Sequence, residues 1–161
     1  MKILILICSL FISNTGNKAK ADFSNHPIQT DTSRYAILKY TPDRGRYVFN
    51  GNVKPTTLSN TEIQNVITLV NKRVAEYNNS EKKTKYPLLI NHPEKYFKQF
   101  IAVINSKGEK EVWINCFCSV DNLTYWRKDV VNVMDGGSCF FNLKINLTKG
   151  ITYDLMVNGI A

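Results

Sequence analysis

The apolar residues of this chain follow two different repeats. From about residue 59 to residue 78 they recur every three or four positions, and from residue 96 onward many of them alternate with polar residues. The first repeat is that of a helix with one apolar face, and the second is that of strands with one buried face. The order along the chain therefore predicts a helix followed by a sheet.

The helical repeat covers residues 60–78. Its apolar positions are Ile63, Val66, Ile67, Val70, Val74 and Tyr77. The sequence Ser-Asn-Thr-Glu at 59–62 is a capping box, in which the serine hydroxyl and the glutamate carboxylate satisfy opposite backbone amides at a helix start. A helix with one apolar stripe must bury it, and the chain offers no second helix of equal strength, so a sheet is the expected partner.

Five later segments have the length and composition of strands, namely residues 96–105, 110–118, 129–134, 139–147 and 151–157. Apart from residues 119–128, the connections between them are short, which favours consecutive antiparallel pairing. In the last two segments the alternation predicts one buried face and one wet face, with Ile151, Tyr153, Leu155 and Val157 on the buried side. A further hairpin is expected from residues 34–40 and 46–49.

These elements predict an α+β fold in which one long amphipathic helix packs on a curved antiparallel sheet of four to five strands in meander order. Such an arrangement is similar to the cystatin-like architecture, which also includes nuclear-transport-factor-like domains. A likeness at the level of architecture implies little about function.

The first 21 residues differ from the rest. A lysine at position 2 is followed by a ten-residue apolar run at 3–12, interrupted only by Ser9, and then by Ala-Lys-Ala at 19–21. This pattern is typical of a signal peptide cleaved between Ala21 and Asp22. The apolar run is shorter than the roughly 20 residues that span a bilayer, although an anchor that stays attached is the alternative. We therefore expect an exported protein, periplasmic or secreted, with a flexible arm at residues 22–34 and a single domain at residues 35–161.

Net charge excludes one class of partner. The chain carries a formal charge of +8, and loss of the three lysines in residues 1–21 leaves about +5. The remaining basic residues are mostly scattered singly and form no stripe with exposed aromatic residues, so nucleic acid is not an expected partner. The common nucleotide-binding and hydrolase motifs are absent as well.

Three cysteines follow the signal peptide. In an oxidising compartment an odd number allows one disulfide, here Cys139 with Cys116 or Cys118, or else three buried thiols. All three share strand parity with apolar residues, so their side chains are expected to face the core. A thiol active site or a metal site would need His92 beside them, and their spacing matches no known zinc motif. We therefore predict no catalytic residue, no metal and no cofactor.

Asp135, Gly136 and Gly137 separate two predicted strands. A phosphate-binding loop would open onto a helix, whereas this one opens onto the segment at 139–147. Glycine reaches positive φ without a side-chain clash, so the three residues predict a tight hairpin turn in which the aspartate bonds its own backbone.

The longest connection contains Tyr125, Trp126 and Arg127. Aromatic side chains beside a cation on a loop are good anchors for a partner. The alternative is that Trp126 folds back to cap the sheet.

Three stretches, residues 96–117, 134–150 and 153–161, resemble a family of small exported proteins of unknown function that is frequent in Bacteroidetes. They contain the Asp-Gly-Gly sequence and end in Asn-Gly-Ile-Ala. The resemblance implies export and the fold, and it brings no activity with it.

We therefore expect a small exported, non-enzymatic binding or envelope-associated module. Its partner would be an unknown protein or envelope component, contacted by the polar sheet face and by residues 125–127. The architecture suggests a second hypothesis, an inhibitor of an extracytoplasmic protease or toxin. A third hypothesis is an enzyme with a cryptic site around His92 and the cysteines.

Overall fold

The computed structural model describes residues 32–45 and 48–160. In chain order the elements are η1 (Thr32–Arg34), β1 (Tyr35–Ile37), α1 (Pro42–Gly45), β2 (Lys54–Pro55), α2 (Asn60–Glu81), η2 (Pro93–Lys95), β3 (Phe97–Ile104), β4 (Lys110–Phe117), η3 (Gly137–Cys139), β5 (Phe140–Asn146) and β6 (Ile151–Val157). The predicted signal peptide, its cleavage site and residues 22–31 of the predicted arm lie outside the described residues. Within the described part, no helix has both the length and the apolar character needed to cross a membrane.

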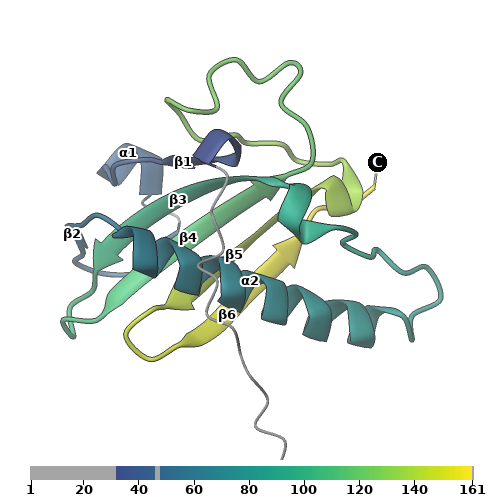
Figure 1. Cartoon of the computed structure of the whole chain (residues 1–161), viewed down its shortest axis with the longest axis horizontal. Helices are drawn as coiled ribbons and strands as arrows, with labels where there is room; N and C mark the ends of the chain where they lie inside the picture. Colours follow the sequence, from purple (N-terminus) through teal and green to yellow (C-terminus); the bar gives the residue numbers. More distant parts are fainter. Residues whose placement is uncertain (1–31, 46–47, 161) are drawn as a thin grey trace, which may run out of the picture.

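The predicted α+β fold is confirmed. The long helix α2 packs on a six-stranded, mostly antiparallel sheet, and β3, β4, β5 and β6 follow one another as a meander. Figure 1 shows α2 lying across one face of this sheet. β1 pairs with the other side of β3 in parallel, and the two-residue β2 pairs with β3 in antiparallel orientation.

The capping box holds the start of α2. Ser59 Oγ accepts a hydrogen bond from the Glu62 backbone N–H at 3.2 Å, and the Glu62 carboxylate accepts one from the Ser59 N–H at 2.8 Å. The same carboxylate lies 2.6 Å from Lys110 Nζ, which joins the helix start to β4. The bond from Lys110 is the largest of the causes that lower the pKa of Glu62.

Alternate residues of the strands form the main core under α2. Ile63, Val66, Val70 and Val74 of the helix are buried, and they share one cluster with the helix-facing side chains of β3, β4 and β5. Those side chains are Phe100, Ala102, Val112, Ile114, Cys116, Phe141, Leu143 and Ile145. The period of two that predicted the strands therefore produces this core directly.

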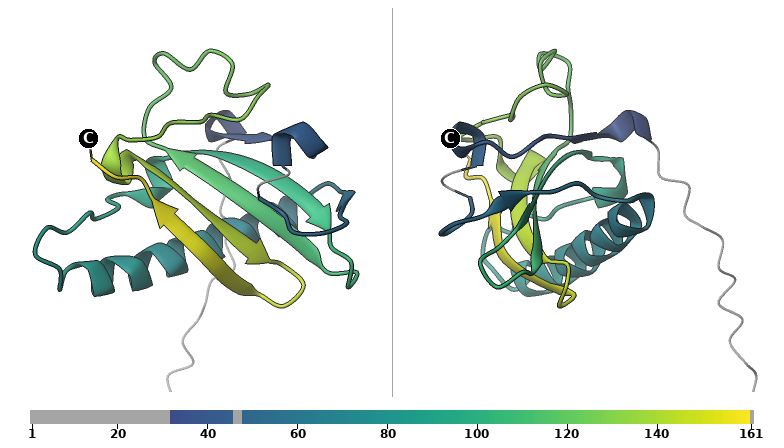
Figure 2. Two further views of the ribbon diagram at one scale, coloured as in Figure 1. Left: turned by 180° about the vertical axis from the view of Figure 1, so that it is seen from behind. Right: turned by 90° about the vertical axis from the view of Figure 1, so that its left-hand side faces the viewer.

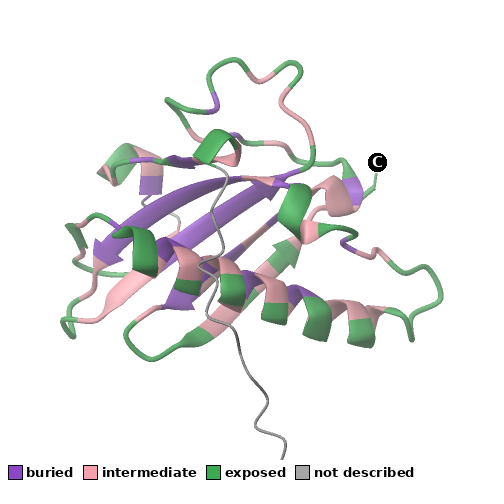
Figure 3. Cartoon of the chain, viewed as in Figure 1, coloured by how far each residue is buried: buried purple, intermediate pink, exposed green. Residues whose placement is uncertain are grey.

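The opposite face of the sheet, which we call the outer face, is only half open. Over β3 and β4 a second cluster buries Ile101, Trp113 and Phe117 beneath the N-terminal segment and part of the connection between β4 and β5. Figure 3 shows the resulting difference, with β3 and β4 buried along most of their length and β6 exposed at intervals. The wet face predicted from the last two strand segments therefore does not extend over β3 and β4.

Residues 129–134 form no strand, contrary to the prediction. They run without regular structure, and residues 118–136 therefore make one long connection between β4 and η3, which we call the link. Figures 1 and 2 show that part of the link extends beyond the sheet. Its later part lies on the outer face, because buried side chains of β3 and β4 bind its backbone.

The predicted hairpin near residue 40 is also wrong. β1 pairs with β3, and the chain then turns into α1 at Pro42, where the backbone N–H groups of Arg44 and Gly45 both donate to Thr41 O. Residues 46–47 of the second predicted strand lie outside the described residues.

A β-bulge changes the side-chain alternation of β6. The register with β5 shifts between Asn142, which faces Met156, and Lys144, which faces Tyr153. The extra residue, Asp154, has φ of 51°, a left-handed conformation that aspartate tolerates better than most residues. Leu155 packs on the main core, whereas Tyr153 and Met156 line hollows of the outer face. The predicted grouping of Ile151 and Tyr153 with Leu155 and Val157 is therefore wrong.

Replacing the cap residue tests the start of α2. We expect Ser59→Ala to lower the free energy of unfolding by about 1 kcal/mol, because the Glu62 N–H loses its acceptor. Urea denaturation measures the change. The matched control is Ser80→Ala in the exposed last turn, which should shift stability by no more than about 0.5 kcal/mol. Equal effects at the two serines would contradict the capping role.

Candidate functional site

Three adjoining hollows follow β5 on the outer face. The first, of about 230 Å³, and the second, of about 320 Å³, share Val48, Trp113 and Asn142. The second and the third, of about 390 Å³, share Lys144. We call this combined depression the outer groove. It follows β5 from Phe140 to Asn146, a distance of about 20 Å at roughly 3.3 Å per residue.

The buried carboxamides of Gln99 and Asn115 build one wall of the groove by binding the link. Gln99 Nε2 donates to Trp126 O and, at 2.7 Å, to Asp129 O. Val131 is held by both of its main-chain polar groups, since its N–H donates to Gln99 Oε1 at 3.0 Å and its carbonyl accepts from Asn115 Nδ2 at 2.7 Å. Gln99 is fully buried and Asn115 is 7% exposed. The amides thus supply the hydrogen bonds that a neighbouring strand would have supplied if residues 129–134 had formed the predicted strand.

Aromatic packing fixes the earlier part of the link. The Trp126 ring lies edge-on to Phe97 and Phe117, with centroids 5.4 and 5.9 Å away, and it is 7% exposed. The Arg127 guanidinium stacks 4.2 Å above the Trp126 ring and donates to the Tyr35 carbonyl at 3.1 Å. This is the alternative in which Trp126 caps the sheet. Tyr125 is 42% exposed, and its contact with a partner stays a prediction.

A disulfide joins Cys118, the first residue of the link, to Cys139 in η3, just beyond the end of the link. It is one of the two pairings that the sequence left open. β4 ends at Phe117, so Cys118 is exposed, and the expectation that all three cysteines face the core is wrong for this residue. Disulfides are typical of oxidising, extracytoplasmic compartments, in agreement with the predicted export.

The remaining cysteine is inaccessible. Cys116 is fully buried in the main core, and this burial raises the pKa of its thiol to about 12. His92 is exposed, with its Nδ1 3.3 Å from Glu94 Oε1. In the part of the chain that the structure describes, no group of three or more histidine, cysteine or acidic side chains is placed to hold a metal ion.

The Asp-Gly-Gly segment enters β5 through η3. Gly136 and Gly137 have φ of 90° and 57°, and a Cβ on Gly136 would meet the Phe140 ring at 2.7 Å. Asp135 and Gly136 end the link and Gly137 begins η3, so the segment is not the turn of a two-stranded hairpin as predicted. Its backbone is fastened by Asn158, whose Nδ2 donates to Val133 O at 2.6 Å and to Asp135 O at 2.9 Å.

Paired charges occupy the far end of the groove. Glu109 lies 2.6 Å from Lys149 Nζ and also accepts from Asn146 Nδ2 at 2.7 Å. These two bonds, with that from Lys149 the stronger, lower the pKa of Glu109 to about 2. Lys144 Nζ lies 2.7 Å from Asp154 Oδ2. Charge in this part of the groove is therefore largely balanced within the protein.

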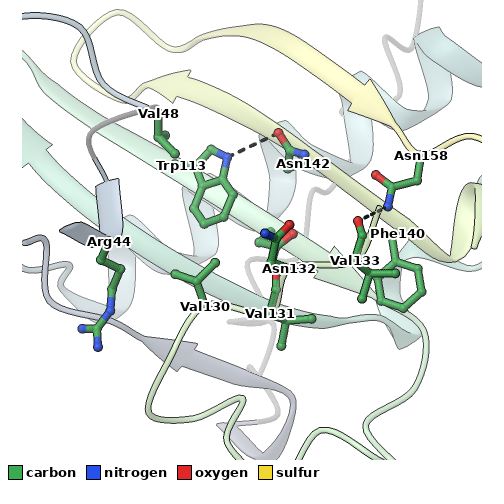
Figure 4. Close-up of a pocket in the computed structure, with 11 residues that line it drawn as sticks. Arg44, Val48, Trp113, Val130, Val131, Asn132, Val133, Phe140, Asn142 and Asn158 are labelled. Atoms are coloured by element: carbon green, nitrogen blue, oxygen red, sulfur yellow. Dashed lines mark hydrogen bonds between the residues drawn. The ribbon is translucent and has the colours of Figure 1, made fainter. Parts of the chain in front are cut away.

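Unused hydrogen-bonding groups occur at the opposite end, where the lining includes Arg44, paired with Asp129 at 3.3 Å. Asn142 Oδ1 accepts from Trp113 Nε1 at 3.3 Å, whereas no described residue accepts from Asn142 Nδ2. Asn132 is exposed, and its backbone N–H and C=O likewise have no partner among the described residues. Figure 4 shows Asn132, Asn142 and Asn158 around the first hollow. These groups are available to a ligand.

Sequence reasoning missed the amides that build this site. Gln99 and Asn115 each interrupt an apolar strand, in Phe-Lys-Gln-Phe-Ile and in Trp-Ile-Asn-Cys-Phe. A polar residue at a buried position needs a hydrogen-bond partner, and this was the signal that something must cover the outer face.

Comparison of the chain with protein-family models, with characterised proteins and with solved structures found no match. The resemblance to small exported Bacteroidetes proteins stays a prediction.

Replacing the buried glutamine tests how the wall is held. We expect Gln99→Met to lower the free energy of unfolding by about 2–3 kcal/mol, because it leaves two carbonyls and the Val131 N–H without partners. Urea denaturation measures stability, and hydrogen exchange at the Val131 amide reports the wall itself. The matched control is Gln64→Met on α2, since Gln64 Oε1 has no described partner and its loss should cost little. Unchanged exchange at Val131 would contradict this account.

A thiol reagent tests the accessibility of Cys116. After removal of residues 1–21, we expect the folded, oxidised protein to react with none of the reagent and the urea-unfolded protein to react at Cys116 alone. Absorbance of the released chromophore counts the modified thiols. Rapid labelling of the folded protein would instead show a reactive thiol and favour the cryptic enzyme.

Proposed function

We propose that the protein is an extracytoplasmic, non-enzymatic binding module whose ligand occupies the outer groove. The observation that carries this proposal is the wall of the groove, a segment of the link bound by the buried amides of Gln99 and Asn115. Burying amides is costly unless each is satisfied, and an apolar covering would shield the sheet at lower cost. A wall held in this way, beside unpaired polar groups, is suited to recognition.

The chemistry of the groove favours binding over catalysis. General acid–base catalysis works best with a group whose pKa lies near the operating pH. The pKa of Glu109 is instead lowered to about 2, while burial raises the pKa of Tyr153. The end at the first hollow offers carboxamides, backbone groups and the Arg44 guanidinium, which bind a ligand without transferring protons.

An inhibitor of an extracytoplasmic protease or toxin is the second candidate. It is favoured by one observation, the projection of the link beyond the sheet in Figures 1 and 2, with Tyr125 42% exposed on it. A loop of this kind could enter the cleft of an enzyme, and its base is closed by the disulfide.

Site-directed photo-cross-linking in the cells that make the protein tests these candidates. A photoreactive residue replaces Met156, which is 64% exposed in the groove, or the control Tyr86, which is 78% exposed beyond the end of α2. We expect an adduct at position 156 and none at position 86. Filling the groove by Asn142→Trp should remove the adduct, because the ligand is excluded.

The same method separates the two candidates. A photoreactive residue at position 125 that forms the only adduct, with an extracytoplasmic enzyme, would favour the inhibitor. Equal labelling at positions 156 and 86 would contradict the groove as a binding site.

A further inference from the structure

We infer that the ligand of the outer groove is an extended segment of another polypeptide chain, recognised mainly through its main chain. This inference rests on the proposed function, since it names the class of ligand for the same groove. It follows from the way the outer face already binds a segment of this protein.

The outer face already binds one irregular segment of this chain. Residues 129–133 lie on the outer face as an irregular segment, and the face holds them by main-chain atoms of Asp129 and Val131. One carboxamide oxygen takes the Val131 N–H and a neighbouring carboxamide nitrogen takes its C=O. These two bonds recognise the main chain of a residue, whatever its side chain is. The outer face is therefore chemically suited to a polypeptide backbone.

Asn142 continues the row of carboxamides that holds the link. In the strand register Gln99 lies opposite Asn115, and Asn115 lies opposite Asn142, so the three form one row of carboxamides across β3, β4 and β5. The first two hold the link. Asn142 is the next member of the row. It lines the groove, and its Nδ2 has no partner within the described residues. The groove thus continues the established interface by one carboxamide.

The wall of the groove also presents main-chain groups to a ligand. The N–H and C=O of Asn132 and the C=O of Val130 have no partner among the described residues, and both residues line the first hollow. An extended chain lying beside them could form the main-chain bonds of a strand pair, as in recognition by strand addition. Binding through Asn132 on one side and Asn142 on the other repeats the grip on Val131.

The second hollow determines which side chain of the ligand is preferred. It lies between Val48, Trp113 and Met156 and has a volume of about 320 Å³, which suits an apolar side chain. Lys144 and Asp154 on its rim are paired with each other at 2.7 Å. With charge balanced in this way, the groove favours an uncharged stretch, and its length of about 20 Å accommodates roughly six extended residues.

A glycan is the competing ligand class. Oligosaccharide sites commonly use an exposed aromatic face as a platform. Trp113 is only 8% exposed, and Lys144 Nζ lies over the Tyr153 ring, 5.2 Å from its centroid. The groove offers peptide-like donors and acceptors in place of such a platform. Oligosaccharides therefore form a separate arm of the test.

The experiment selects linear peptides of about eight residues from a random display library on the folded, disulfide-intact protein. Dissociation constants of the synthetic peptides are then measured by calorimetry. We expect Asn142→Leu and Met156→Glu each to weaken binding at least about tenfold, and N-methylation of one central peptide amide to do the same. The matched control, Asn122→Leu, changes an exposed asparagine of the link outside the groove and should leave affinity unchanged.

Each other outcome has a defined meaning. Peptides that bind equally well to the Asn142→Leu and Met156→Glu variants bind elsewhere, which overturns the inference. Groove-dependent binding that tolerates N-methylation of every central amide overturns main-chain recognition. If short chitin or cellulose oligosaccharides bind in an Asn142-dependent manner and no peptide does, the polypeptide inference fails while the proposed groove stands. Failure of both probe classes, together with no adduct at position 156, overturns the groove as well.

Discussion

The bonding of two side-chain amides, those of Gln99 and Asn115, to the backbone of the link is the interaction on which the outer half of the molecule depends. These amides lie in the middle of the sheet, where an unsatisfied polar group costs about 1–3 kcal/mol. If the link moved away from the sheet, its carbonyls and the amides of Gln99 and Asn115 would therefore lose their hydrogen-bond partners. This mutual dependence keeps a segment without regular secondary structure in one place.

The two faces of the sheet are covered in different ways. The face under α2 is closed mainly by apolar contacts, in a core that the helix completes. The outer face is covered only over β3 and β4, where Trp126 and Val131 pack with Trp113 and Phe117. The groove lies along β5, at the boundary between the covered strands β3 and β4 and the open strand β6. Its position thus follows from how far the link reaches across the sheet.

The parts that depend on local pattern were predictable. The Ser59 capping box, the helix behind it and the four strands of the meander all follow from residue spacing. Residues 129–134 were mistaken for a strand because Val131 and Val133 alternate as strand residues do, and the pattern cannot show that side-chain amides take the place of a neighbouring strand. Likewise, no alternation reveals that Asp154 adds one residue to β6 and reverses the facing of its first half. The groove depends on both features, so the sequence alone could not locate it.

The bulge at Asp154 also bears on how the molecule behaves at high concentration. Within the described residues β6 is the last strand of the sheet and pairs on one side only, which leaves a row of backbone groups that could recruit a second copy. A left-handed aspartate in the middle of that row, tied to Lys144, interrupts the regular spacing that a docking strand would need. The irregularity that shapes the rim of the groove is therefore also one that disfavours strand pairing with a second copy at this edge of the sheet.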